Sequence, residues 1–200
     1  ILTELQRIIR TSGTGRGTKR ETDPMKKLIA GGDGYLGWPT AMKLSAKGHD
    51  VLVADNYLRR NISLETDSDP LYAVPNLLER TRIWEEKTNR KIETAIGDLA
   101  RWDFIESVFK SFEPDAVVHY AEQPSAPYSM LDRTAAMLTL NNNLNVTMNI
   151  IFAVRQFAPD AQIVKLGTMG EYGTPNIDIE EGWLEVESKG RKDKFLFPRQ

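Results

Sequence analysis

The sequence predicts an α/β fold with a doubly wound, mainly parallel sheet. Short apolar runs typical of buried strands alternate along the chain with segments of helical apolar spacing, which indicates βαβ units. A glycine triplet, Gly31-x-x-Gly34-x-x-Gly37, follows the first apolar run and opens a helical segment. A carboxylate, Asp55, ends the second run about 20 residues later. Together these observations predict a Rossmann-type dinucleotide-binding domain.

Five apolar runs are short enough for strands, and four longer segments carry the three-and-four spacing of helices. Gly48 is typical of a helix end and Pro75 of a helix start, whereas 56–74 is polar without a clear period and is expected to be a loop. The expected strands are Lys27–Ala30, Val51–Ala54, Ile92–Ile96, Ala116–His119 and Ile163–Leu166. The expected helices are Trp38–Lys47, Asn76–Thr88, Arg101–Phe112 and Ala135–Phe157. Two further runs, Trp183–Val186 and Lys194–Phe197, flank Lys189-Gly190 and predict a hairpin.

Composition excludes several functional classes. The chain has 200 residues, of which 40% are hydrophobic, enough for one domain with a sizeable core. A net charge of -2 argues against a nucleic-acid surface, and no apolar run reaches the roughly 20 residues of a membrane helix. The chain has no cysteine and only two histidines, so we expect neither disulfides nor a metal site.

The first 24 residues are polar and precede Met25, where an apolar strand follows at once. We therefore expect a disordered leader over 1–24 and an incomplete NAD-binding domain over 25–200. The alternative for the leader is the end of a transit peptide, because basic residues lie among Ser and Thr. The expected location is the cytoplasm, or the plastid stroma for a plant-type protein.

The glycine triplet has a specific physical rationale. The first glycine permits a tight turn, the second lets backbone N–H groups approach a pyrophosphate, and the third lets the helix pack closely on the strand. The N-terminus of the following helix favours the anion. Asp55 is placed to accept hydrogen bonds from the adenosine ribose, which favours NAD over NADP. Arg59 and Arg60 leave the alternative open, since a nearby guanidinium can hold a 2′-phosphate.

Four further polar residues lie in or close to the expected sheet. Asp98 is expected to face the adenine amino group, to cap the next helix, or both. Asn142 and its neighbour Asn143 are poor helix formers inside a long helix, which suggests a role facing the cofactor. His119 lies within an apolar strand, where a lone histidine is more often a satisfied core residue than a catalyst.

The turn after the fifth strand carries a hydroxyl, a carboxylate and a phenol between glycines. Thr168 could polarise a sugar oxygen, and Glu171 could move a proton if burial raised its pKa. Tyr172 could pack against a ligand or hydrogen-bond to it. The alternative for Glu171 is a solvated loop carboxylate.

These motifs resemble the extended short-chain dehydrogenase/reductase superfamily and, within it, the UDP-sulfoquinovose synthase family. The resemblance runs from about Met25 to the end of the chain. The glycine motif is common to the superfamily, whereas the runs around Ser125 and Thr168 are far more specific. The matching segments are Gly32–Trp38, Asp55-Asn56 with Arg59-Arg60, Gly97-Asp98, Glu122-Gln123, Ser125–Met130 and Lys165–Ile179.

The resemblance implies an NAD-dependent enzyme that joins UDP-glucose and sulfite into UDP-sulfoquinovose for sulfolipid or sulfonated-glycan synthesis. We class the expected enzyme as a hydrolase, and the full-length protein as a homodimer. Thr168 and Glu171 would be catalytic, and Gln123, Ser125, Met169 and Tyr172 would bind the substrate. The implied cofactor-binding set is Gly31, Asp33, Gly34, Tyr35, Leu36, Gly37, Asp55, Asn56, Arg59, Arg60, Asp98, Leu99 and Asn142.

The chain departs from the pattern of its relatives in two places. Pro124 stands where related enzymes carry arginine, so a guanidinium expected near the ligand is replaced by a ring without a donor. The Tyr-x-x-x-Lys pair of the superfamily is expected after Gln200, so we expect a fragment, truncated before the C-terminal substrate-binding part, without turnover of its own.

Two alternatives stay open. A UDP-sugar 4-epimerase is the nearer one, since 4,6-dehydratases typically place Asp-Glu directly after the threonine where this chain has Met169-Gly170. A non-catalytic dinucleotide-binding module is the other.

Overall fold

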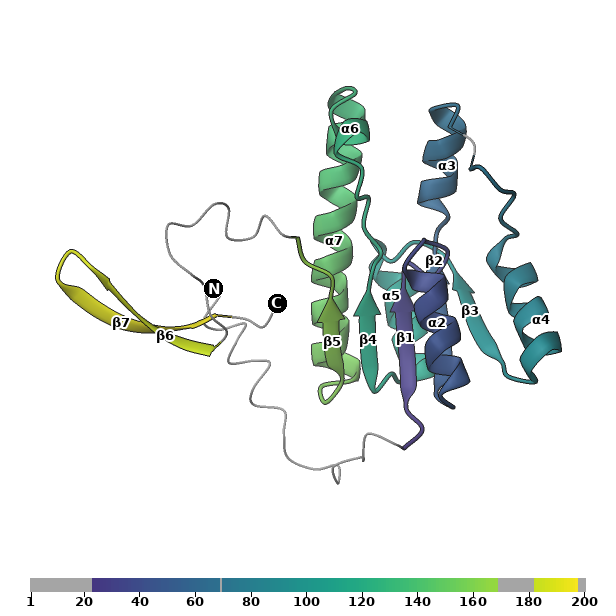
Figure 1. Ribbon diagram of the computed structural model, residues 1–200, viewed down its shortest axis with the longest axis horizontal. Helices are drawn as coiled ribbons and strands as arrows, with labels where there is room; N and C mark the ends of the chain where they lie inside the picture. Colours follow the sequence, from purple (N-terminus) through teal and green to yellow (C-terminus); the bar gives the residue numbers. More distant parts are fainter. Residues whose placement is uncertain (1–22, 69, 169–181, 198–200) are drawn as a thin grey trace. The chain divides into compact units, whose positions relative to one another are not determined.

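The computed structural model describes residues 23–68, 70–168 and 182–197, and it divides the chain into two compact units (Figure 1). The first unit ends at Leu166 and the second begins at Gly167, a division that has no counterpart among the sequence predictions. The predicted leader lies outside the described residues except for its last two, so the boundary at Met25 stays a prediction.

Five parallel strands form the sheet of the first unit, in the order β3-β2-β1-β4-β5. This order reverses between β1 and β4, which makes the carboxyl end of β1 a topological switch point where ligands of such sheets bind. The predicted Rossmann-type sheet is therefore confirmed. The strands are β1 Lys26–Ala30, β2 Asp50–Asp55, β3 Ile92–Ile96, β4 Ala116–His119 and β5 Gln162–Lys165.

Helices cover both faces of this sheet (Figure 1). Side chains of α2 and α4 pack against one face, and side chains of α5 and α7 pack against the other. The helices of the first unit are α2 Gly37–Ala46, α3 Leu58–Glu65, α4 Leu77–Thr88, α5 Trp102–Phe112, α6 Ala126–Ser129 and α7 Arg133–Phe157.

Alternation along the strands divides the core into two clusters. In β1, Leu28 and Ala30 belong to the α5–α7 side, whereas Ile29 belongs to the α2–α4 side, and all three are fully buried. Phe109 of α5 fills the first cluster and Leu77 of α4 the second. Each fully buried Leu, Ile or Phe contributes about 1.5–3 kcal/mol to folding. Nearly all buried residues of the three central strands β1, β2 and β4 are apolar, on both faces, for this reason, whereas the edge strands β3 and β5 carry exposed polar residues.

Helix α3 lies where the sequence predicts a loop. The prediction of a loop over 56–74 is wrong for Leu58–Glu65. The Asn56 side chain accepts a hydrogen bond from the Leu58 backbone N–H and starts this helix. Its apolar side is only two residues, Leu58 and Ile62, one helical turn apart, and both line a cleft. So short a stripe among polar residues leaves almost no periodic signal in the sequence.

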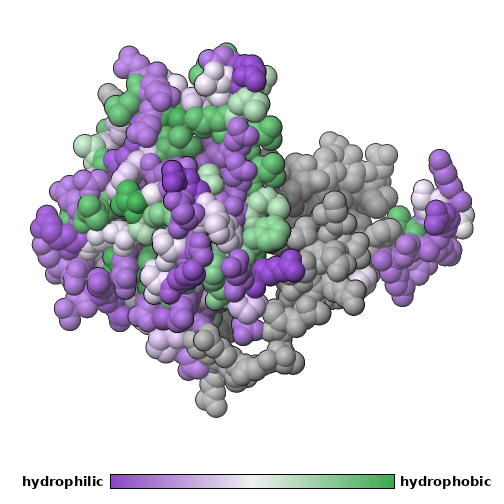
Figure 2. All heavy atoms as spheres, turned by 180° about the vertical axis from the view of Figure 1, so that it is seen from behind, coloured by the Kyte–Doolittle hydropathy of each residue, from purple (hydrophilic) through white to green (hydrophobic). Residues whose placement is uncertain are grey.

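Helix α7 presents an apolar stripe that the described part of its own chain leaves exposed. It begins at Arg133, two residues earlier than predicted, because the Asp132 carboxylate accepts a hydrogen bond from the Ala135 backbone N–H. Figure 2 shows apolar side chains among polar ones on the face that Figure 1 hides. The exposed apolar residues of α7 are Met137, Leu140, Leu144, Met148 and Phe152. None of the helices in the described ranges is both long and apolar enough to cross a membrane.

The second unit contains the predicted hairpin. Its strands, β6 Gly182–Ser188 and β7 Arg191–Phe197, are antiparallel, and Ser188 pairs with Arg191 next to the turn. The two turn residues, Lys189 and Gly190, both have positive φ, at 51° and 74°. Positive φ at both central positions is the signature of a type I′ turn, whose twist suits a two-residue hairpin.

His119, in β4, is a satisfied core residue. Its side chain is 1% exposed, its Nε2 lies 3.0 Å from the Thr147 hydroxyl, and its Nδ1 accepts a hydrogen bond from the Ala121 backbone N–H. Because Nδ1 accepts, the neutral ring carries its proton on Nε2 and donates it to Thr147. Burial lowers the pKa of His119 to about 4.

We expect this histidine to make the fold sensitive to acid. The unfolded chain takes up a proton near the ordinary histidine pKa of about 6.5, whereas the folded chain resists protonation until pH falls to about 4. The free energy of unfolding therefore does not depend on the titration of this histidine above pH 6.5. As the pH falls from 6.5 to 4, protonation of His119 in the unfolded chain lowers the free energy of unfolding by up to about 3 kcal/mol. His119→Gln cannot take up this proton, so its unfolding free energy should fall less over that interval. Urea unfolding of both proteins at several pH values measures the difference, and parallel curves would contradict the assignment.

Candidate dinucleotide-binding site

A cleft of about 780 Å³ lies at the carboxyl ends of the five parallel strands of the first unit. Most of its lining residues come from the segments that directly follow each strand, and Asn142 and Val146 come from α7. The volume lies within the usual range of cofactor sites. Of the residues predicted to bind cofactor or substrate, those that line the cleft are Gly31, Asp33, Gly34, Tyr35, Leu36, Gly37, Asp55, Asn56, Arg59, Asp98, Leu99, Gln123, Ser125 and Asn142.

The glycine turn between β1 and α2 leaves no room for side chains at its two ends. Gly31 has φ +87°, and a Cβ there would lie 2.6 Å from the Tyr120 carbonyl carbon. A Cβ on Gly37 would lie 2.0 Å from the Gly31 carbonyl oxygen, so the helix could not approach the strand. At Gly34 the nearest atom would be 3.4 Å away. Packing thus requires the outer two glycines, whereas the middle one leaves a bare backbone facing the cleft, as a pyrophosphate would need.

The Asp55 carboxylate connects the end of β2 to the glycine turn. Its Oδ2 accepts the Asp33 backbone N–H at 2.9 Å and its Oδ1 accepts the Tyr57 backbone N–H at 2.7 Å. Burial raises the pKa of Asp55, and these two hydrogen bonds oppose the rise. Each carboxylate oxygen has a further lone pair, so Asp55 can also accept a ribose hydroxyl from the cleft.

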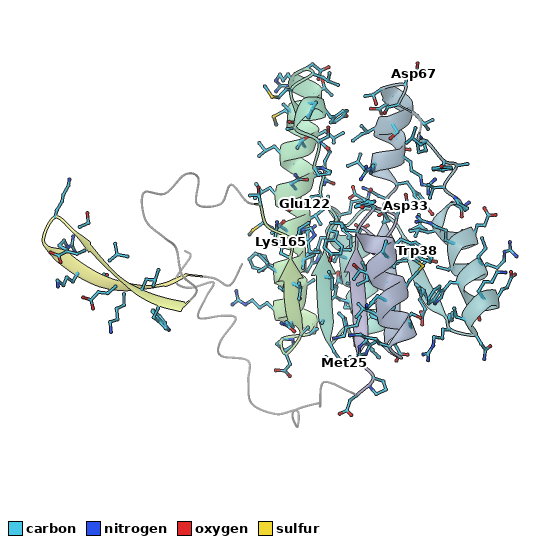
Figure 3. All side chains as sticks on the ribbon, in the orientation of Figure 1. Met25, Asp33, Trp38, Asp67, Glu122 and Lys165 are labelled. Atoms are coloured by element: carbon cyan, nitrogen blue, oxygen red, sulfur yellow. The ribbon has the colours of Figure 1, made fainter. Side chains whose placement is uncertain are left out.

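The Asp33 side chain is held by two arginines. Arg60 Nε lies 2.7 Å from Oδ2, its NH2 lies 2.9 Å from Oδ1, and Arg80 NH2 also bonds to Oδ1. The Arg80 guanidinium lies over the Trp38 ring, 4.9 Å from its centroid. Figure 3 shows Asp33 in the turn that precedes α2 and Trp38 at the start of that helix. Arg60, predicted to bind the cofactor, does not line the cleft.

Arg80 has no counterpart in the sequence predictions. It lies 47 residues from Asp33 in the sequence and belongs to none of the motifs described above. Only the packing of α4 beside α2 brings it to the turn. A single arginine in an amphipathic helix carries no sequence signal for such a contact.

Asp98 and Asn56 meet at the neighbouring strand end. The Asn56 amide donates to Asp98 Oδ1 at 3.3 Å, and the same oxygen accepts the Ala100 backbone N–H at 2.9 Å. The N-cap of α5 is Arg101, without a side-chain cap, so the interpretation of Asp98 as that helix's N-cap is wrong. Leu99 is buried, and Asp98 remains in the cleft lining.

The segment after β4 is held by an asparagine of α7. Asn143 Oδ1 accepts the Gln123 backbone N–H at 2.8 Å, and Asn143 Nδ2 donates to the Gln123 carbonyl at 3.1 Å. The Gln123 side chain, 5% exposed, donates to the Ser125 carbonyl and to the Thr139 hydroxyl. Asn142 lines the cleft and donates to Asn143. Asn143 therefore supports the wall of the cleft, and Asn142 forms part of its lining.

The remaining wall of the cleft includes Pro124, which stands where related enzymes carry arginine. Pro124 is exposed and lines the cleft, and the Ser125 hydroxyl accepts the Tyr128 backbone N–H at the start of α6. Glu122 forms an ion pair with Lys165 at 2.8 Å, which joins the ends of β4 and β5 (Figure 3).

The predicted catalytic residues belong to the second unit or lie outside the described residues. Thr168 is exposed, belongs to the second unit and is the last described residue before 182. Met169, Glu171 and Tyr172 lie outside the described residues, so the catalytic and sugar-binding roles of all four stay predictions. Over the parts of the chain that the structure describes, no group of three or more His, Cys, Asp or Glu side chains could hold a metal ion.

Comparisons with known proteins show the family of this chain. A model of the NAD dependent epimerase/dehydratase family matches residues 27–188. The chain is 47% identical over 173 residues to the chloroplastic UDP-sulfoquinovose synthase of Spinacia oleracea, and 41% identical over 177 residues to that of Sulfolobus acidocaldarius. The UDP-glucose 4-epimerase of Bifidobacterium longum, solved in complex with NAD+ and UDP, superposes with a TM-score of 0.59 at 25% identity, covering 76% of this chain and 39% of that one.

The chain spans less than half the length of each of these two synthases. The aligned parts are 86% of this chain and 36% of the spinach protein, and 88% of this chain and 45% of the Sulfolobus protein. The classification as a hydrolase is wrong, because the matching proteins are synthases and epimerases of the epimerase/dehydratase family.

We expect Asn143→Ala to destabilise the fold by about 2 kcal/mol, because it leaves both backbone groups of the half-buried Gln123 segment without their partner. Asn141→Ala, an exposed asparagine on the same helix, is the matched control and should change the unfolding free energy by less than about 0.5 kcal/mol. Urea unfolding of the three proteins measures both values. Equal losses in the two variants would show that the Gln123 contacts contribute nothing specific.

Proposed function

We propose, from the premise that this chain belongs to the NAD dependent epimerase/dehydratase family, that its first unit binds NAD for a UDP-sulfoquinovose synthase. The observation that supports NAD binding is the joint geometry of the glycine turn and Asp55. Gly34 presents bare backbone to the cleft, and the carboxylate that would receive the ribose is bonded directly to that turn.

Each end of the cleft suits a different part of the dinucleotide. The N-terminus of α2 and the backbone around Gly34 favour the pyrophosphate. Asp55 suits the adenosine ribose, and Asp98 with Asn56 suits the adenine. Asn142, on the wall formed by α7, lies with Gln123 and Ser125 toward the part of the cleft left for the nicotinamide and the sugar.

The substrate assignment rests on sequence identity to the synthases. Identity of 47% and 41% over most of this chain exceeds the 25% shared with the Bifidobacterium epimerase, which favours the synthase over a 4-epimerase. The substrates would be UDP-glucose and sulfite. When bound, NAD supplies an acceptor for a hydride from C4 of the glucose and returns that hydride at the end. Thr168 would hydrogen-bond the C4 oxygen, and Glu171 would move a proton during loss of water across C5 and C6.

The same relationship suggests assembly and location. We propose a homodimer for the whole protein, and the cytoplasm or the plastid stroma as its place of action. The spinach relative is the support for the stroma, because its name describes it as chloroplastic.

We expect Gly34→Ala to weaken NAD binding by about tenfold or more, because a methyl group would occupy the space that a pyrophosphate needs beside the backbone. The added Cβ would touch the Gly31 carbonyl oxygen at an ordinary 3.4 Å, so the melting temperature should stay close to that of the parent. Calorimetric titration with NAD and thermal unfolding test the two halves of this expectation. Unchanged affinity in a folded variant would argue against the turn as the pyrophosphate site.

We expect the complete gene product that carries this chain to convert UDP-glucose and sulfite to UDP-sulfoquinovose in the presence of NAD. Mass spectrometry of the nucleotide sugars distinguishes this product from UDP-galactose, which a 4-epimerase would form without sulfite. Formation of UDP-galactose with no uptake of sulfite would replace the synthase assignment by the epimerase.

A further inference from the structure

In the glycine turn beside Asp55, one carboxylate, that of Asp33, forms ion pairs with two arginines. Asp33 lines the cleft, whereas the two arginines that hold it, Arg60 and Arg80, do not. The Asp33 side chain is 8% exposed, that of Arg80 is 11% exposed and that of Arg60 is 32% exposed. Asp33 therefore borders the cleft, and its carboxylate is bonded to two guanidinium groups that do not.

These guanidiniums lie at the position where a 2′-phosphate would need them. The Asp33 backbone N–H is bonded to the Asp55 carboxylate, which would receive the ribose hydroxyls, and the charges of Arg60 and Arg80 act on Asp55. Arginine beside this ribose is the usual means of holding a 2′-phosphate, because its planar fork matches phosphate oxygens. Two arginines at this corner would by themselves favour NADP.

In this chain both guanidinium groups are already bonded to Asp33. Arg60 donates to both carboxylate oxygens of Asp33 and to the carbonyls of Val74 and Pro75. Arg80 donates to the Asp33 carboxylate and carbonyl while its guanidinium covers Trp38. Its buried Nε has no hydrogen-bond partner within the described part of the chain. An incoming phosphate would meet the Asp33 carboxylate first and would have to displace it.

We propose that Asp33 is a specificity-determining residue, which excludes dinucleotides bearing a 2′-phosphate by holding Arg60 and Arg80 away from the cleft. This inference rests on the proposed binding of NAD. It assigns the cofactor preference to two carboxylates with separate tasks. Asp55 receives the ribose hydroxyls, and Asp33 occupies the cations that would otherwise attract a phosphate.

Asp33 can be tested apart from Asp55, because only the Asp33 side chain holds the arginines whereas its backbone N–H makes the bond to Asp55. Asp33→Asn keeps the side-chain size and that backbone bond but removes the negative charge. We expect it to shift the ratio of the NAD and NADP dissociation constants toward NADP by about tenfold or more. NADP should also raise the melting temperature of the variant, since a phosphate would replace the lost counter-charge between the two partly buried arginines.

Three further variants make the test specific. Arg60→Met added to Asp33→Asn should reverse the gain for NADP, because it removes one of the released guanidiniums. Asp103→Asn breaks another Asp–Arg pair, the exposed one with Arg101 outside the cleft, and should leave the ratio of the two dissociation constants unchanged. Asp33→Ser provides a second variant of the same position in case Asp33→Asn does not fold.

Calorimetric titration of the complete chain and its variants with NAD and with NADP gives the deciding ratio. A ratio that moves toward NADP in the Asp33 variants alone supports the inference. Equal weakening of both dinucleotides in folded Asp33 variants would overturn it and leave Asp33 as a support for the turn. Absence of binding of either dinucleotide by the parent chain would instead overturn the proposed function, which keeps the two failures distinct.

Discussion

One hydrogen bond, from the Asp33 backbone N–H to the Asp55 carboxylate, joins the two features on which the site depends. It connects the glycine turn after β1 with the end of β2, across the edge of the sheet where both strands stop. The turn itself has little freedom, because Gly31 contacts the backbone after β4 and Gly37 contacts Gly31. A ligand that enters the cleft therefore meets donors and an acceptor that are already positioned, so little ordering entropy is lost when it binds.

The negative charges around this hydrogen bond are balanced by positive ones. Burial raises the pKa of Asp55, and Asp33 adds to that rise because it places a second carboxylate nearby. Arg80 opposes the effect, since its guanidinium reaches the same corner from α4. The role proposed for Asp55, accepting ribose hydroxyls, needs an ionised carboxylate, and the two backbone N–H donors and the arginine favour that state. The corner thus combines two negative and two positive side chains within a largely buried space.

Helix α7 contributes to the cleft in a different way from the strands. The strands bring their carboxyl ends to one edge through the pairing of the sheet, whereas α7 supports an irregular segment through side chains. Asn143 satisfies both backbone groups of Gln123, a task that a regular strand partner would otherwise perform. Buried backbone groups outside regular structure need such partners, which is a physical reason for asparagines inside a helix where propensity alone disfavours them.

The amino-acid sequence by itself determined the five strands, four of the helices, the hairpin and the glycine turn, because apolar periodicity and turn residues are local signals. It also placed Asp55 and Asp98 at strand ends, since a residue after a buried run needs no tertiary information to be located. The tertiary structure alone decided that Arg80 reaches Asp33 from 47 residues away and that Arg60 lies behind Asp33 instead of in the cleft. It likewise decided that Leu58–Glu65 is helical and that Asn143 holds Gln123. These contacts depend on which helices pack side by side, and no periodicity within one segment can specify its neighbour in space.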